Sequence, residues 1–190
     1  MGYNSSTPSM KAIPWEVDSA KLTDAYVAGF LDGDGSIVAT TDFRPERRRF
    51  PHRIRLKINF TQHVRHIKFL EALRRYLGGV GNIRVNKIRS LAELVILDRR
   101  QLKVTATRLL PHTVIKKRQV RALLSIIEIF EGATVKVRSS LSEKEYEDIV
   151  SLTREIRQLN SGTGGKQAIA LFDPVTTQDI KSGVAAPRGS

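Results

Sequence analysis

Hydrophobic residues recur at helical spacing in five segments of the chain. Thr23 is a favourable helix N-cap and the acid Asp24 suits a first turn, so a helix is predicted to run from there to Leu31 and to stop at the following glycines. The other helical patterns cover His66–Leu77, Arg99–Leu109, Lys117–Phe130 and Glu143–Asn160. Ser142 and Glu145 form a capping box, which predicts the start of the last helix.

Four segments alternate apolar and polar residues in the way of a half-buried strand. Arg53–Phe60 does so without a break, and the other three are Ser36–Phe43, Gly81–Asn86 and Ala92–Leu97. Pairs of strands that alternate with helices predict an α+β fold, with an αββαββα core and a curved antiparallel sheet. We expect the helices to pack on the apolar face of this sheet and the opposite face to be polar and basic.

The patterned region defines the expected domain. Residues 1–20 are predicted to be an N-terminal arm, partly vector-derived or flexible, because Pro8 and Pro14 interrupt them. Residues 21–160 form the predicted domain, and residues 161–190 are predicted to be a flexible tail that ends in an expression-vector scar, Pro187–Ser190. The apolar runs are too short for a transmembrane helix, and the polar first residues do not resemble a secretory signal.

Composition adds a partner class to this picture. The chain has 190 residues, 41% of them hydrophobic, which is enough for one domain with a core, and it has no cysteine for disulfides or zinc. Its formal net charge of +13 indicates a polyanionic partner. A ribosomal-type protein and a membrane-surface binder are the alternatives. The basic residues lie mostly in strand-like and loop-like stretches rather than on an amphipathic helix, which favours nucleic acid over a membrane.

The first helix carries the most informative pattern. Ala25, Gly29 and Gly33 recur every four residues, so one stripe of this helix has almost no side chain and allows a second helix to approach closely. If two copies pack along the stripe, their Asp34 carboxylates meet, and a divalent metal such as Mg²⁺ relieves the repulsion. The alternatives are a simple turn or a calcium-binding EF-hand loop. The loop fits poorly, because Ile37 stands where it needs glycine.

The segment Val27-Ala28-Gly29-Phe30-Leu31-Asp32-Gly33-Asp34-Gly35 resembles the motif of the LAGLIDADG homing endonucleases, with Val for the first Leu and Gly for the third Ala. The resemblance extends over about Leu22 to Asn160 and is greatest to the single-motif, homodimeric enzymes of group I introns. No later helix repeats the motif, so the chain supplies half of a two-helix interface and predicts a C₂ dimer. The dimer interface is predicted to contain Ala25, Ala28, Gly29, Asp32 and Gly33.

The resemblance implies roles for individual residues. Asp34 and the carbonyl of Gly33 would hold the metal, whereas Asp32 is expected to cap or hydrogen-bond at the helix end. Gln62 would order water at the cleavage centre, or be a surface residue. His66 stands where relatives often carry an Arg beside the scissile phosphate, so Arg65 or His63 could supply that charge instead.

Lys116 matches the family's catalytic lysine. Lys116, Lys117 and Arg118 would stand at a helix start, where cations oppose the helix dipole unless an anion such as phosphate binds there. Lys116 would stabilise charge or orient water; the alternative is a solvated basic cluster. Asp34, Gln62, Lys116 and His66 are therefore the predicted catalytic residues.

The resemblance further implies that the sheet is a DNA-binding saddle. Arg can read guanine, Asn can read adenine and acidic residues can accept from cytosine. The predicted DNA-facing residues are Ser36, Val38, Thr40, Asp42, Arg44, Arg53, Arg55, Lys57, Asn59, Arg84, Asn86, Arg89 and Glu93.

The expected function is cleavage of both strands of a long, pseudo-palindromic DNA site by metal-assisted hydrolysis, leaving short 3′ overhangs. Mg²⁺ is the expected cofactor, with Mn²⁺ also supporting activity, and no small-molecule substrate or membrane is expected. An RNA maturase or a non-cutting DNA-binding protein on the same fold are the alternatives. The cellular location is not determined by the sequence; the resemblance suggests a chloroplast or mitochondrial gene, with a bacterial host as the alternative.

Overall fold

The computed structural model describes residues 21–161, except 45, 47–48, 51 and 136–140. The predicted N-terminal arm and nearly all of the predicted tail lie outside the described residues. The described elements are the helices and strands α1 (Asp24–Asp34), β1 (Gly35–Phe43), β2 (His52–His63), the 3₁₀ helix η2 (Val64–His66), α2 (Ile67–Tyr76), β3 (Asn82–Asn86), β4 (Leu91–Ile96), α3 (Arg99–Leu109), α4 (Lys117–Val135) and α5 (Glu143–Asn160).

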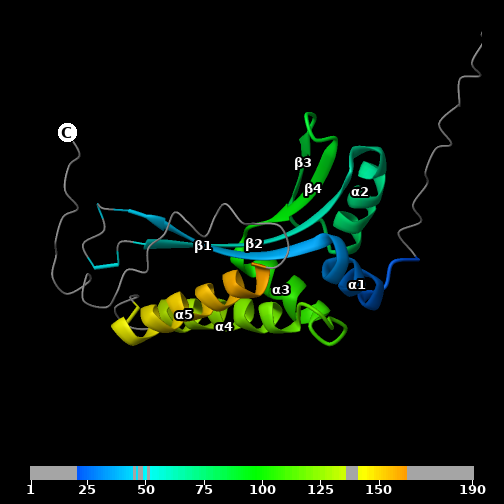
Figure 1. The fold of residues 1–190 in the computed structure, drawn as a ribbon. Helices are drawn as coiled ribbons and strands as arrows, with labels where there is room; N and C mark the ends of the chain where they lie inside the picture. The colour runs from blue at the N-terminus through cyan, green and yellow to red at the C-terminus, as the bar shows by residue number, and fades with distance from the viewer. Residues whose placement is uncertain (1–20, 45, 47–48, 51, 136–140, 162–190) are drawn as a thin grey trace, which may run out of the picture.

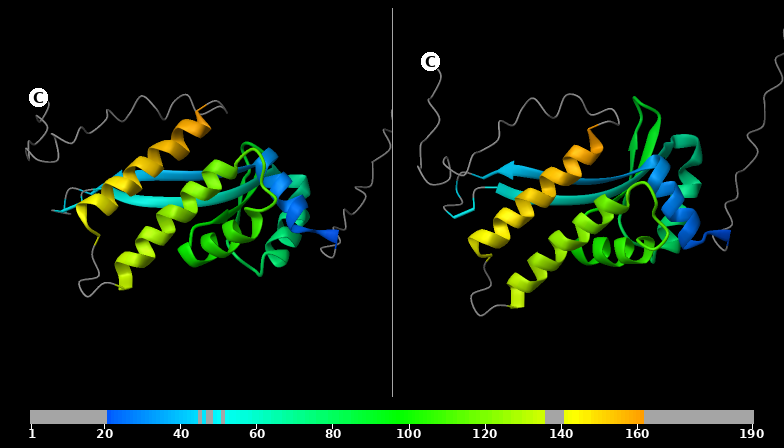
Figure 2. Two further views of the ribbon diagram at one scale, coloured as in Figure 1. Left: turned by 90° about the horizontal axis from the view of Figure 1, so that it is seen from below. Right: turned by 60° about the horizontal axis from the view of Figure 1, so that its bottom comes forward.

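The four described strands form one curved antiparallel sheet in the order β1-β2-β4-β3. Helices α3, α4 and α5 lie below the sheet in Figure 1, and the concave face above it carries no described helix. Seen from below, α4 and α5 run side by side across β1 and β2 (Figure 2). This arrangement confirms the predicted α+β architecture.

The core lies between the sheet and the helices, because alternate strand residues point to that side. Ile37 of β1 pairs with Ile58 of β2, and Ile58 pairs in turn with Ile96 of β4; all three side chains are fully buried. Leu123 and Ile126 of α4 are equally buried in the same cluster. The apolar faces predicted from the alternation are therefore the faces that the helices cover.

Several boundaries differ from the sequence prediction. Helix α4 continues to Val135 rather than ending at Phe130, and α2, β3 and β4 differ by one residue at one or both ends. The differences in α1 and β2 lie at the candidate site. Helix α1 does not stop at Gly33 but continues to Asp34, and β1 begins at the next residue. Gly35 makes this abrupt change possible, because a Cβ at this position would lie 2.8 Å from the Leu31 Cα and carbonyl oxygen. Strand β2 also continues past Phe60 to His63, which adds Thr61 and His63 to the polar face.

Helix α5 is fixed at both ends. The predicted capping box is present: Ser142 Oγ accepts from the Glu145 backbone N–H, and the Glu145 carboxylate accepts from the Ser142 backbone N–H. At the other end, Asn160 Nδ2 donates to the Ile37 carbonyl oxygen at 2.8 Å, which attaches the helix to β1.

Among the described helices, none is both long and apolar enough to cross a membrane.

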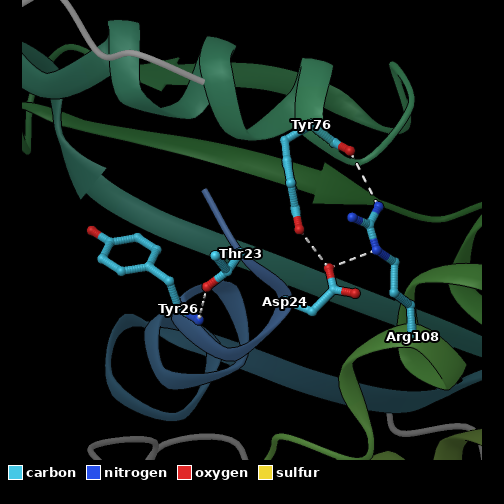
Figure 3. Close-up of polar contacts among 5 residues, drawn as sticks. All are labelled: Thr23, Asp24, Tyr26, Tyr76 and Arg108. Atoms are coloured by element: carbon cyan, nitrogen blue, oxygen red, sulfur yellow. Dashed lines mark hydrogen bonds and ion pairs between the residues drawn. The ribbon is translucent and has the colours of Figure 1, made fainter. Parts of the chain in front are cut away.

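A polar cluster joins the start of α1 to α2 and α3 (Figure 3). The Asp24 carboxylate accepts from the Tyr76 hydroxyl at 2.7 Å and from Arg108 Nε at 2.6 Å. Arg108 also donates to the Tyr76 carbonyl oxygen and lies over the Tyr76 ring. The hydrogen bond from Arg108 is the main reason that the pKa of Asp24 is lowered from its ordinary value. These bonds hold the N-terminal end of α1 against α2 and α3.

Replacing Asp24 with Asn is expected to lower the free energy of unfolding by about 1–2 kcal/mol at neutral pH. The substitution removes the negative charge that strengthens the bonds from Tyr76 and Arg108, and partial exposure to solvent limits the loss. A carboxyl whose folded-state pKa is lowered stabilises the fold above its unfolded pKa, and this contribution disappears as the pH falls through the folded value. Urea unfolding at pH 7 and at pH 3 measures both effects. Asp148→Asn, an exposed change on α5, is the control; equal behaviour of the two variants would contradict this role.

Candidate active site and nucleic-acid interface

The open end of α1 brings together residues that are distant in the sequence. Asp34 is the last residue of α1 and is exposed. Gln62, near the end of β2, donates from Nε2 to Asp34 Oδ2 at 2.9 Å. The contact follows from the sheet register, because Gly35 pairs with Phe60 and Gln62 lies two residues further on the same strand. The two residues predicted for metal and water binding are therefore neighbours.

The loop before α4 is attached to the same end of α1 through Asp32. The Asp32 carboxylate accepts from the backbone N–H groups of Val114, Ile115 and Lys116 at 2.8, 3.1 and 2.9 Å. These groups lie immediately before the N-terminus of α4, where the helix dipole favours an anion. The sequence predicted that an anion such as phosphate would bind at this helix start; in the structure the Asp32 carboxylate of the same chain accepts from these backbone N–H groups.

This attachment positions Lys116 beside the candidate metal ligands. Its Nζ donates to the Asp32 carbonyl oxygen, and its charge lies within electrostatic range of the Asp34 carboxylate. Burial lowers the pKa of Lys116 from its ordinary value, while the Asp32 and Asp34 carboxylates act in the opposite direction. Lys116 is thus half-buried and held in place, which does not fit a solvated basic cluster.

The oxygen atoms at this end of α1 provide only part of the ligand set that a divalent cation such as Mg²⁺ needs. Asp34 supplies a carboxylate, and the carbonyl of Gly33 belongs to the last helical turn, where carbonyls have no partner within the helix. Mg²⁺ is usually bound by one or two carboxylates together with water and substrate phosphate, so these ligands suit it. Among the described residues, no group of three or more His, Cys, Asp or Glu is placed to hold a metal. The neighbouring Asp32 carboxylate is occupied by the loop before α4, and another copy of the chain could supply a second carboxylate.

One side of α1 is open for such a chain. Ala25, Gly29 and Gly33 are exposed, and a Cβ added to either glycine would meet nothing within 4 Å. Large apolar side chains are exposed near both ends of this stripe: Tyr26 is 53% exposed, and Val114 and Ile115 in the loop held by Asp32 are 80% and 74% exposed. A bare stripe beside exposed apolar side chains is typical of a contact surface.

Two of the predicted interface residues do not belong to this surface. Ala28 is fully buried in the core of its own chain, because it lies on the side of α1 that contains Val27 and Leu31. The carboxylate of Asp32 is occupied by the loop before α4. The prediction of Ala28 as an interface residue was therefore wrong, and Asp32 takes the capping role that the sequence also suggested.

The predicted DNA-facing residues lie mostly on the concave face. The exposed ones are Thr40, Arg53, Arg55, Arg84, Asn86 and Arg89. The partly exposed ones are Ser36, Val38, Asp42, Arg44, Lys57 and Glu93. Arg44 follows the end of β1, and Arg89 lies in the turn between β3 and β4. The register places Thr40 opposite Arg55 and Arg84 opposite Glu93, as one face of an antiparallel sheet requires.

Asn59 is the exception on this face. It is only 6% exposed, and its amide is occupied within the chain: Ser36 Oγ donates to Asn59 Oδ1 at 2.5 Å, and Asn59 Nδ2 donates to Thr61 Oγ1 at 3.3 Å. A bidentate contact to adenine needs both groups of the amide. The prediction that Asn59 contacts DNA is therefore not supported; instead, it fixes the hydroxyls of Ser36 and Thr61.

His66 closes the 3₁₀ helix η2, four residues beyond Gln62. Its Nε2 accepts from Arg65 Nε at 3.1 Å, so two of the three residues considered for the phosphate contact lie together. The role of either residue stays a prediction. Thr61 was missed because the predicted strand ended at Phe60, where the alternation stops: Gln62 is polar at a position where an apolar residue would continue it. His63, named from the sequence only as an alternative for the phosphate contact, is the last residue of the same strand.

Comparisons with known proteins agree with this fold and motif. Residues 27–112 match the family model described as LAGLIDADG endonuclease. The DNA endonuclease I-CreI of Chlamydomonas reinhardtii is 34% identical over 109 residues, which are 57% of this chain and 64% of the relative. The matched part of the chain thus spans slightly less than two thirds of that relative's length.

Solved structures extend the likeness to the fold. The homing endonuclease I-CvuI, in complex with its target and in the presence of calcium, has a TM-score of 0.53 and 22% identity over 73% of this chain and 92% of its own. The homing endonuclease I-TnaI has a TM-score of 0.59 and 21% identity over 74% and 97%. The archaeal intron-encoded homing endonuclease I-Vdi141I, complexed with DNA, has a TM-score of 0.58 and 20% identity over 72% and 82%.

The fold and the motif together define the class of protein: an α+β domain whose first helix carries a sequence similar to the LAGLIDADG motif. The match of residues 27–112 and the relationship to I-CreI confirm the resemblance drawn from the motif. The chain is therefore similar in motif and in fold to the LAGLIDADG endonucleases.

Proposed function

We propose that the protein is a homodimeric, site-specific DNA endonuclease that cuts both strands of a long pseudo-palindromic site and leaves short 3′ overhangs. One observation carries the proposal: Gln62 and Lys116, from segments far apart in the chain, both reach the end of α1 that carries Asp34. A non-cutting DNA-binding protein would not need this convergence. The related I-CreI is a DNA endonuclease, which supports the same activity.

The residues at the end of α1 have separate tasks in this reaction. Asp34 and the Gly33 carbonyl would hold the cation, and Gln62, which donates to Asp34, would orient the attacking water from the same side. Lys116 places a positive charge where the phosphate gains negative charge. A bound Mg²⁺ would lower the pKa of water and stabilise the leaving 3′ oxygen. Mn²⁺ offers the same octahedral oxygen coordination and is expected to support cleavage as well.

The proposed dimer follows from the incomplete donor set and from the open stripe on α1. Packing two stripes against each other would place two copies of Asp34 at one seam and two concave sheets along one DNA duplex. Each sheet would then read one half-site, which explains why the target should be nearly palindromic. The net charge of +13 per chain favours such an extended contact with phosphate groups.

Selection of cleaved sites from a randomised duplex library in Mg²⁺ tests this function. We expect a single family of long sites with two-fold symmetry, and no product in EDTA. The same purified protein should bind that site with a steep salt dependence, because each neutralised phosphate contributes roughly 0.9 to the slope of log K against log salt. Absence of cleavage at any sequence, or a nearly flat salt response, would contradict the proposal.

A further inference from the structure

An acidic residue, Asp42, lies among basic residues on the concave face, near the end of the edge strand β1. Asp42 of β1 is directly opposite Arg53 of β2 and diagonal to Arg55, which is opposite Thr40. Its carboxylate oxygen Oδ2 accepts from Arg55 Nε. The side chains of Arg55 and Asp42 are 54% and 34% exposed, so the pair lies on the surface that would face DNA.

Stability does not explain an acid at this place. An exposed ion pair contributes about 0–1 kcal/mol to folding, and salt weakens it. Against this small gain, a carboxylate close to DNA repels the phosphate groups. An acid on such a surface therefore indicates a task in recognition, where repulsion of wrong partners and orientation of the right contact both increase specificity.

The atoms in the contact indicate that task. Asp42 engages only the Nε–H of Arg55, which leaves the outer edge of the planar guanidinium, with Nη1 and Nη2, free of this bond. That outer edge is the part of arginine that can donate two parallel hydrogen bonds to O6 and N7 of guanine in the major groove. An arginine held through Nε loses less side-chain freedom on binding than an unrestrained one.

We propose that Asp42 is a positioning residue that orients Arg55 to read one guanine in each half-site. This inference rests on the proposed function. It differs from direct reading of cytosine by the Asp42 carboxylate, because the Oδ2 atom of that carboxylate is in contact with Arg55.

The test is selection of bound sites from a randomised duplex library without metal, so that binding is measured apart from cleavage. Arg55→Ala should lose the preference for guanine at one position of each half-site, by roughly fivefold to a hundredfold. Asp42→Asn, which removes the charge and keeps the shape, should weaken the preference at that same position by at least about threefold and leave the other positions unchanged. Asp42→Asn should also bind unrelated DNA more tightly than the wild type.

Glu128→Gln is the matched control, because it removes one negative charge from an exposed position on α4, on the helical side of the sheet. It should not change the preference at any position. An unchanged preference in Asp42→Asn, or a change at a position other than that of Arg55, would overturn this inference alone. A wild-type protein that selects no sequence would overturn the proposed function together with it.

Discussion

Replacing Asp34 with Asn is expected to lower the rate of DNA cleavage by at least about a thousandfold, because the substitution removes the carboxylate that holds the cation. The introduced amide keeps the shape of the side chain and an oxygen that can accept from Gln62 Nε2, so the end of α1 should fold unchanged. Binding of the target is expected to stay within a few-fold of the wild type. Single-turnover cleavage in Mg²⁺ and a gel-shift titration measure the two quantities.

A second measurement separates loss of chemistry from loss of structure. The Asp34→Asn protein should have the melting temperature and the oligomeric state of the wild type. Asp148→Asn on α5, which makes the same chemical change away from the site, should cut at the wild-type rate. Wild-type cleavage by Asp34→Asn would remove Asp34 from the chemistry and contradict the assignment of the site.

Replacing Gly29 with Leu is expected to convert the proposed dimer into a folded monomer. Within one chain a Cβ added at this position meets nothing within 4 Å, and leucine forms helix more readily than glycine, so the monomer should be at least as stable. Across a close helix–helix contact, each added side chain costs about 1–3 kcal/mol, so two of them should raise the dimer dissociation constant by roughly thirtyfold or more. Sedimentation velocity and thermal unfolding measure both effects.

Gly132→Leu is the matched control for this change. Gly132 is also an exposed helical glycine with nothing within 4 Å of an added Cβ, but it lies on α4. Its substitution should leave the oligomeric state unchanged. A Gly29→Leu protein that remains a dimer as tight as the wild type would place the interface elsewhere.

The sequence predicted those parts of the molecule that depend on local pattern. The alternation in Arg53–Phe60 identified β2 and its faces, and helices α3 and α5 have the predicted bounds, since an N-cap or a capping box marks their starts. Helix α1 was predicted too short, because Gly33 is a weak helix former but not a barrier where the chain turns at Gly35. The burial of Ala28 could not be derived from the stripe alone, because it depends on how α1 sits against the sheet.

The contacts that determine the site depend on tertiary structure. The approach of Lys116 to the end of α1 results from the three hydrogen bonds between Asp32 and the loop before α4, and these residues are more than eighty positions apart. The same holds for the cluster of Asp24 with Tyr76 and Arg108. Residue types and spacing predicted where the helices and strands lie and which of their positions are polar. They did not predict the hydrogen-bond partner of each polar side chain.

Binding of Mn²⁺ followed by electron paramagnetic resonance tests the central claim most directly, because the claim is that two subunits complete one metal site. With target DNA present, the wild type should bind Mn²⁺ and Asp34→Asn should not. The decisive sample is the monomeric Gly29→Leu protein, which keeps Asp34, Gly33 and Gln62. We expect it to have lost tight Mn²⁺ binding. A monomer that binds Mn²⁺ as tightly as the wild type would show that one chain suffices and would contradict the account.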